Sequence, residues 1–177
     1  MPRIKSEETR RAILEATARL IMQEGVLNLT LEAVAKEAGV SKGGLLYHFP
    51  SKEALVGGLM AHHLECFDAE LKVSERAGDG NLLRAYLETS FDPHSPSRGL
   101  EAALFAAVLL NPDLLIPLRE RYSTLQHEIT ARAQNPTRAT LLRLAADGLW
   151  LTDLLGLGAP TGREREALLT LMRGEAS

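Results

Sequence analysis

The sequence contains little cysteine and no long apolar run, and both absences narrow the class of protein. Its single cysteine, Cys66, excludes an internal disulfide framework and fits a reducing compartment. No apolar stretch is as long as the roughly 18 residues that a membrane span needs, and residues 1–5 are polar where a secretory signal would be apolar. These features predict a cytoplasmic protein with no membrane partner.

Aromatic residues are also scarce, at 5% of the 177 residues, whereas alanine and leucine are abundant. Ala and Leu lose little free energy on entering a helix, while aromatic and β-branched residues prefer strands. With 45% hydrophobic and 24% charged residues, the chain has the balance of an ordinary folded protein. We therefore expect an all-α fold, long enough for one large domain or two small ones.

The net charge of −3 conceals a difference between the two parts of the chain. Residues 1–52 hold eight Lys or Arg against six acids, whereas residues 53–177 hold twelve against seventeen. A mildly basic head on an acidic body suits DNA binding in one orientation, because phosphate repels the body.

Apolar residues recur at helical spacing along most of the chain. In the first such segment Thr17 fills a position on the apolar face, where its hydroxyl can bond to the preceding turn, and Ser6 is placed to cap the helix. Gly25 marks its end. About nine helices are expected, at residues 6–24, 31–38, 42–49, 52–76, 81–91, 98–110, 112–134, 136–155 and 162–173.

The connections between these helices carry recognisable signals. Asn precedes Pro at the start of two segments, Asn111-Pro112 and Asn135-Pro136, as in capped helix N-termini, while Pro117 should kink or shorten its helix. Residues 77–80 and 92–97 read as loops, and Thr161 with Glu164 predicts a capping box.

The second and third segments form the most informative unit. Thr30 caps the second segment and Ser41 caps the third, and only Gly39-Val40-Ser41 separates them. Two short helices around a three-residue turn predict a helix-turn-helix.

Residues 30–55 read TLEAVAKEAGVSKGGLLYHFPSKEAL, which resembles the tetracycline-repressor family of bacterial regulators. The resemblance lies in the turn Ala38–Gly43, in Tyr47-His48 before Phe49, and in Pro50–Glu53 at the start of the next helix, and it covers about residues 8–60. It departs from the family at Leu46, where a tyrosine is usual, so the tyrosine's role does not carry over.

A recognition helix presents donors to phosphates and to base edges while its backbone comes close to the groove. Lys42 is the expected base reader, through guanine acceptors, and Gly43 with Gly44 would permit close approach. The resemblance implies phosphate contacts at Thr30, Tyr47, His48 and Lys52. The full predicted DNA-binding set is Thr30, Ser41, Lys42, Gly43, Gly44, Leu46, Tyr47, His48 and Lys52.

Individual members of this set have simpler interpretations. Tyr47 can be a half-buried core residue, Lys42 can be a solvated surface lysine, and Leu46 can pack inside or touch a thymine methyl. Val34, Ala35, Val40, Leu45 and Phe49 are expected to form the core that sets the angle between the helices.

The resemblance implies that the C-terminal helices form a dimer around an effector pocket. Segment 136–155 is apolar on two faces, so each face needs a packing partner. One partner is the core of its own chain, and the other is the same helix of a second chain. The alternative is a monomer in which the core buries both faces. The predicted dimer residues are Leu141, Leu144, Gly148, Leu151, Leu155, Leu168, Leu171 and Met172.

The effector is expected to be a small apolar or aromatic molecule. Trp150 with Asp147 is the leading pocket pair, and Phe67 and Leu71 can pass a change in the pocket to the head. The pocket set is Phe67, Tyr86, Phe91, Phe105, Tyr122, Asp147 and Trp150, and the alternative is that these residues are ordinary core.

No feature of the sequence points to an enzyme, a metal or a cofactor. His62, His63 and Cys66 lie close together in the sequence, and His62 and Cys66 fall one turn apart on the same helix face. These two ligands do not make a zinc site, because a structural zinc normally takes four and the chain has no other cysteine. No catalytic Ser-His-Asp spacing, phosphate-binding glycine loop or carboxylate pair is present.

The sequence thus predicts a DNA-binding head at residues 1–52 and an effector-binding and dimerisation body at residues 53–177. Its expected partners are a palindromic DNA operator, a second copy of the chain and a small effector that releases the repressor. The alternative is a helical small-molecule binder or enzyme with an incidental helix-turn-helix.

Overall fold

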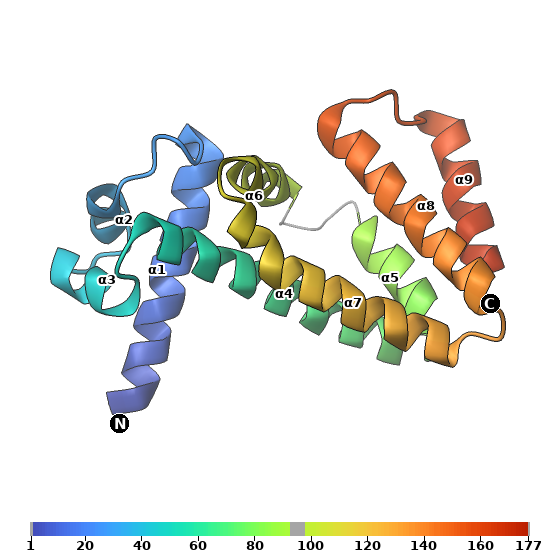
Figure 1. Cartoon of the computed structure of the whole chain (residues 1–177), viewed down its shortest axis with the longest axis horizontal. Coiled ribbons are helices and arrows are strands. Elements are labelled where there is room, and N and C mark those ends of the chain that lie inside the picture. Colours follow the sequence, from blue (N-terminus) through green and yellow to red (C-terminus); the bar gives the residue numbers. More distant parts are fainter. Residues whose placement is uncertain (1, 93–97, 177) are drawn as a thin grey trace. The chain divides into compact units, whose positions relative to one another are not determined.

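The computed structural model describes residues 2–92 and 98–176, and it is helical throughout these ranges (Figure 1). The expected loop at residues 92–97 lies outside the described residues except for Asp92. The described elements are α1 (Pro2–Glu24), α2 (Leu31–Glu37), α3 (Lys42–His48), α4 (Lys52–Ala77), α5 (Leu82–Ser90), α6 (Arg98–Leu110), the 3-10 helix η1 (Pro112–Leu114), α7 (Leu115–Arg132), α8 (Pro136–Leu155) and α9 (Gly162–Glu175).

The chain divides into two compact units, with divisions inside α4 and α7. We call residues 1–65 with 96–118 unit 1, and residues 66–95 with 119–177 unit 2. The expected boundary at residue 52 does not coincide with a division between these units, and it stays a prediction.

The core of unit 1 is built by α1, α2, α3, the first half of α4, α6 and η1. Ile13 and Leu14 of α1, Leu45 of α3 and Leu55 of α4 are completely buried in it. Thr17 is buried among them, and its Oγ1 donates to the carbonyl oxygen of Ile13 at 2.7 Å, as the sequence predicts. Packing of α1 against α2, and of α2 against α3, therefore holds the helix-turn-helix in place.

Three expectations about helix ends are corrected. Helix α1 begins at Pro2, so Ser6 lies inside it and is not its cap. Thr161 precedes α9 but makes no side-chain cap bond, so the capping box does not form. The segment expected at 112–134 splits into η1 and α7, which places Pro117 in the first turn of α7, where a missing N–H costs nothing.

The core of unit 2 is built by the second half of α4 with α5, α7, α8 and α9. Leu87 of α5, Leu125 and Ile129 of α7, and Ala146 of α8 are nearly inaccessible within it. Both expected Asn caps form, because Asn111 Oδ1 accepts from Asp113 N at 3.1 Å before η1 and Asn135 Oδ1 accepts from Arg138 N at 3.0 Å before α8. Asn81 Oδ1 also caps α5, accepting from Arg84 N at 3.0 Å, although the sequence did not predict this cap.

Candidate nucleic-acid interface and effector region

Local hydrogen bonds shape the turn between α2 and α3 as the sequence predicts. Thr30 Oγ1 accepts from Ala33 N at 3.2 Å, and Ser41 Oγ accepts from Gly44 N at 3.0 Å. Gly39 adopts a left-handed conformation with φ of 67°, and Val40 N then bonds back to the carbonyl of Ala35 at 2.9 Å. Gly39 thus ends α2 and Ser41 starts α3, with four residues, 38–41, between the two helices, one more than the sequence predicts.

Helix α3 separates a buried face from an exposed one. Leu45 and Phe49 point into the core of unit 1, and the expected framework residues Val34 and Ala35 of α2 are buried beside them. The opposite face carries the predicted contacts: Tyr47 is 83% exposed, which contradicts its alternative interpretation as a core residue. Leu46 is 37% exposed, so its side chain is accessible as well.

The whole predicted DNA-binding set lies within unit 1, and none of its members is buried. It comes from the cap of α2, from α3 with its cap, and from the first residue of α4, as follows: Thr30, Ser41, Lys42, Gly43, Gly44, Leu46, Tyr47, His48 and Lys52. One short stretch of chain therefore brings these groups to the surface together.

The two glycines of α3 are not demanded by the fold. Neither has a positive φ, and a Cβ added at Gly43 would meet nothing within 4 Å. A Cβ at Gly44 would lie 3.2 Å from Ser41 Oγ, a slightly tight contact. The start of α3 is thus bare backbone at the surface, which a DNA groove can approach closely.

Both lysines of the set have partners in the free protein. Lys42 Nζ forms an ion pair with Glu32 of α2, and this hydrogen-bonded ammonium holds the pKa of the Glu32 carboxyl below its usual range. Lys52 Nζ donates to the carbonyl oxygen of Leu27 at 3.0 Å. Any anionic partner of Lys42 must therefore compete with Glu32.

Phe49 joins α3 to α4 and α1. The position that a Cβ would take at Gly58 of α4 lies only 2.5 Å from Phe49 Cε1, so the ring packs directly on the glycine backbone. The Arg10 guanidinium lies 5.4 Å from the centre of the same ring, within cation–π range. This packing fixes the direction in which α3 presents its exposed face.

In unit 2, part of the predicted effector set forms one polar cluster. Tyr86 OH donates to Asp147 Oδ1 at 2.5 Å and lies 3.5 Å from Tyr122 OH. Arg143 Nη1 contacts Asp147 Oδ2 at 2.5 Å, and the Arg143 guanidinium lies 5.9 Å from the centre of the Tyr122 ring. We call these four residues the Tyr86–Asp147 cluster.

Burial perturbs the titration of this cluster. It raises the pKa of the Tyr86 hydroxyl well above its usual range, and the nearby Tyr122 and Asp147 add to that effect. Burial also raises the pKa of the Asp147 carboxyl, against the lowering effects of Tyr86 and Arg143. The sequence analysis missed Arg143, although its position four residues before Asp147 places the two on one face of a helix.

The other predicted effector residues are distributed unevenly. The Phe67 ring meets the Tyr86 ring edge-on with centroids 6.0 Å apart, and Trp150 packs half-buried against the core of unit 2. Phe91 is buried beneath the Arg165 guanidinium, at 5.6 Å from its ring centre. Phe105 belongs to unit 1, whereas the other six predicted effector residues belong to unit 2.

The predicted dimer residues of α8 are largely exposed. Leu141 is 66% exposed and Leu144 is 53% exposed, and Gly148 and Leu155 are also at the surface. The opposite face of α8 buries Leu142, Ala146 and Leu149. Because Leu141 and Leu144 are exposed, α8 is not completely buried within one protomer, which contradicts that alternative. In α9, Leu171 is exposed and Leu168 half-buried, whereas Met172 is 3% exposed and faces the core of its own chain.

The histidines of α4 show no metal site. Among the residues that the structure describes, no group of three or more His, Cys, Asp or Glu side chains is arranged to hold a metal ion. Burial lowers the pKa of His63, a shift that Glu101 opposes and His62 reinforces. Within the same described ranges, no helix is long and apolar enough to cross a membrane.

Two segments of the chain match families of known proteins. Residues 13–59 match the family described as bacterial regulatory proteins, tetR family, and residues 80–176 match the tetracyclin repressor-like C-terminal domain. The chain is 31% identical over 173 residues to the HTH-type transcriptional regulator BetI of Burkholderia thailandensis, which covers 89% of this chain and 88% of the relative.

Solved structures agree with these matches. A TetR family member from Streptomyces coelicolor A3 superimposes with a TM-score of 0.72 at 25% identity, over 93% of this chain and 98% of that one. The multidrug binding protein EbrR in complex with ethidium superimposes with a TM-score of 0.69 at 25% identity, over the same shares of the two chains.

Proposed function

Because this chain belongs to the tetR family of bacterial regulatory proteins, it is a DNA-binding transcriptional regulator, and we propose that it represses transcription from a palindromic operator until a small effector binds. Regulators of this family bind operator DNA, dimerise and bind small-molecule effectors. The partners of this chain are accordingly operator DNA, a second copy of the chain and a small effector. The proposal places the protein in the cytoplasm, where bacterial DNA lies.

The exposed face of α3 is the observation that carries the DNA-binding site. It offers a lysine, two bare glycines and an exposed tyrosine, while Leu45 and Phe49 anchor the other face. Lys42 at the first turn of α3 is the proposed base reader, because the N-terminal residues of a recognition helix reach base edges. Tyr47, His48, Thr30 and Lys52 are the proposed phosphate contacts, supported by their accessibility and their common origin in one stretch of chain.

Selection of bound sequences from random DNA duplexes tests the proposed site. The wild-type protein should enrich a palindrome with half-sites about one helical turn apart. Lys42→Ala should bind more weakly with a changed base preference, whereas Lys72→Ala, which removes an exposed lysine of α4 in unit 2, should select the wild-type sequence. Failure of the wild-type protein to enrich any motif overturns the proposal in favour of a helical small-molecule binder or enzyme.

The exposed leucines of α8 support a dimer interface with α9. Leu141, Leu144 and Leu171 place apolar surface in water that a second copy would cover. Met172 is better assigned to the core of its own protomer, because its side chain does not reach the surface.

Light scattering tests this interface. The wild type should show twice the chain mass at micromolar concentration, and Leu144→Arg should shift it toward the monomer. Leu109→Arg places the same charge on a more exposed leucine of α6 and should leave the dimer intact. A wild-type monomer, or equal dissociation by both variants, contradicts the assignment.

The Tyr86–Asp147 cluster with Phe67 and Trp150 is the proposed effector site. Four aromatic side chains and a carboxylate in one region of unit 2 suit an aromatic effector, and a positive charge on it would replace the Arg143 guanidinium at Asp147. EbrR, the neighbour solved with ethidium, suggests an aromatic cation as the first probe.

Titration of the protein with ethidium, without DNA because ethidium intercalates, tests the effector site. Binding should quench Trp150 fluorescence, and Asp147→Asn should weaken it, while Asp153→Asn at the surface of α8 should not. Equal affinity of the wild type and Asp147→Asn removes the carboxylate from the site.

A further inference from the structure

One pocket of unit 2 is separate from the Tyr86–Asp147 cluster. It has a volume of about 450 Å³, and it is lined by the N-terminal end of α5, the α7–α8 connection and the C-terminal end of α9. None of its lining residues belongs to that cluster. Its size is within the range of small-molecule sites, which is roughly 300–1,000 Å³.

Three arginines from different elements line the pocket. Arg84 comes from α5, Arg132 from the end of α7 and Arg138 from the first turn of α8. All three side chains keep contact with solvent, at 30%, 54% and 47% exposure. Asp79 and Glu175 are the acids of the lining, and Glu75 next to it faces Arg132.

Carboxylates of the protein already occupy these guanidinium groups. Arg84 Nη1 lies 2.7 Å from Asp79 Oδ2, Arg132 Nη1 lies 2.5 Å from Glu75 Oε1, and Arg138 pairs with Glu175. The planar guanidinium matches a carboxylate in shape and charge. A carboxylate arriving from outside would therefore replace one of these side chains by an equivalent interaction.

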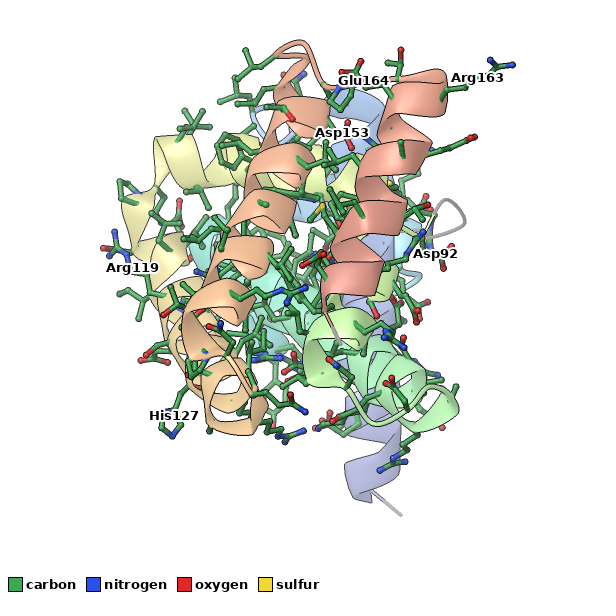
Figure 2. The ribbon with its side chains drawn as sticks, turned by 90° about the vertical axis from the view of Figure 1, so that its right-hand side faces the viewer. Asp92, Arg119, His127, Asp153, Arg163 and Glu164 are labelled. Carbon is green, nitrogen blue, oxygen red and sulfur yellow. The ribbon has the colours of Figure 1, made fainter. Side chains whose placement is uncertain are left out.

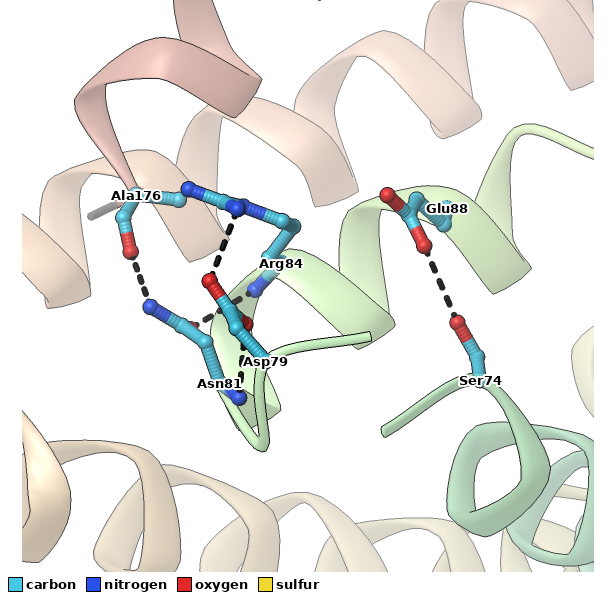
Figure 3. Close-up of polar contacts among 6 residues, drawn as sticks. All are labelled: Ser74, Asp79, Asn81, Arg84, Glu88 and Ala176. Atoms are coloured by element: carbon cyan, nitrogen blue, oxygen red, sulfur yellow. Dashed lines mark hydrogen bonds and ion pairs between the residues drawn. The ribbon is translucent and has the colours of Figure 1, made fainter. Parts of the chain in front are cut away.

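Side chains of the core form the inner wall of the pocket. Leu82, Leu83, Ile129 and Ala139 line it and belong to the buried core of unit 2. Asn81 holds the wall in place, since its Nδ2 donates to the carbonyl oxygen of Ala176 at 2.5 Å and its Oδ1 caps α5 (Figure 3). Three guanidinium groups and several apolar side chains therefore line the same pocket, a combination that suits a molecule with one anionic end and an apolar body.

We propose that this pocket is a second ligand site, which binds a small carboxylic acid with an apolar body. The ligand carboxylate takes the place of Glu175 on Arg138, with Arg84 beside it, and the apolar body lies against the pocket wall, where small parts of Leu82 and Leu83 remain accessible. Because Glu175 is the last residue of α9, the exchange acts on the end of the helix that carries Leu168 and Leu171.

Calorimetric titration with octanoate tests the proposal. Octanoate should bind one to one, and Arg138→Gln and Arg84→Gln should each weaken it at least tenfold. Arg163→Gln is the matched control, because this arginine extends from the outer surface of α9, outside the pocket, and its loss should leave the affinity unchanged (Figure 2). Acetate, which lacks the apolar body, should bind at least tenfold more weakly than octanoate.

A second variant keeps the test decisive if the arginine variants fold poorly. Glu175→Gln removes the internal competitor and should strengthen octanoate binding. No octanoate binding at millimolar concentration, or equal affinity of the wild type, Arg138→Gln and Glu175→Gln, overturns the proposal. Operator binding by the same variants is measured separately, so that this failure is distinct from a failure of the proposed function.

Discussion

Lys42, the first residue of the proposed recognition helix α3, forms an ion pair with Glu32 in the first turn of α2. Both side chains are more than half exposed, so solvent screens the pair and its worth to stability is small. Its importance lies in binding, because Glu32 holds the ammonium group that the proposed site offers to DNA. The same carboxylate also adds a negative charge next to the expected phosphate backbone.

Glu32→Gln should therefore strengthen DNA binding by about two- to fivefold, the size expected for an exposed charge pair. The slope of log affinity against log salt should become steeper if the freed lysine contacts a phosphate. Fluorescence anisotropy at several salt concentrations measures both quantities. Glu37→Gln removes an acid of the same helix that pairs instead with Arg19, and it should have a smaller effect. Weaker binding by Glu32→Gln would show that the pair orders Lys42 for DNA.

Tyr47→Ala should separate binding from stability. The side chain is almost fully exposed, so the free energy of unfolding should change by no more than about 0.5 kcal/mol. Affinity for the selected operator should fall about five- to tenfold, as expected for one lost hydrogen bond. Val73→Ala trims another exposed side chain and should change neither quantity. A large loss of stability in Tyr47→Ala would restore the interpretation of this tyrosine as core.

Two glycines should respond oppositely to alanine. At Gly58 the new Cβ collides with the Phe49 ring, so Gly58→Ala should cost about 1–2 kcal/mol after the gain in helix propensity. At Gly43 the Cβ meets open space, so Gly43→Ala should stabilise by up to about 1 kcal/mol while weakening DNA binding. Urea unfolding and operator binding measure the two effects, and unchanged DNA affinity in Gly43→Ala would remove close approach from the mechanism.

His63 should make stability depend on pH. Because burial holds its pKa below the usual value, the unfolded chain binds the proton more readily than the native one. The contribution of His63 to the free energy of unfolding is therefore complete above about pH 6.5, the usual histidine pKa. It is lost as the pH falls from there through the lowered pKa of the native state. Glu101 and His62 act on the same group, with opposite signs.

Urea unfolding at about pH 7.5 and pH 5.5, on either side of the usual histidine pKa, measures this effect. The wild type should lose more stability between these values than His63→Gln does. His127→Gln, at the exposed surface of α7, should behave as the wild type (Figure 2). Equal losses in the wild type and His63→Gln would show that another group carries the dependence.

The sequence alone determined the helix-turn-helix, its two N-caps and the buried residues Val34, Ala35, Leu45 and Phe49, whereas the structure decided that Tyr47 and Leu46 are exposed. The turn and its caps depend on interactions within a few residues, such as Ser41 Oγ with Gly44 N and the left-handed Gly39, and residue type decides such interactions locally. The apolar spacing of α8 likewise indicated two faces, one of which remains exposed in the protomer.

Only the tertiary structure decided which side chains from distant segments meet. It placed Met172 inside its own core, put Phe105 in the other unit and joined Tyr86 to Asp147 and Arg143. It also brought Glu32 to Lys42 and the three arginines to one pocket. Periodicity shows that a helix has a face, but the direction of that face, and so the partner of each charge, depends on how all the helices pack together.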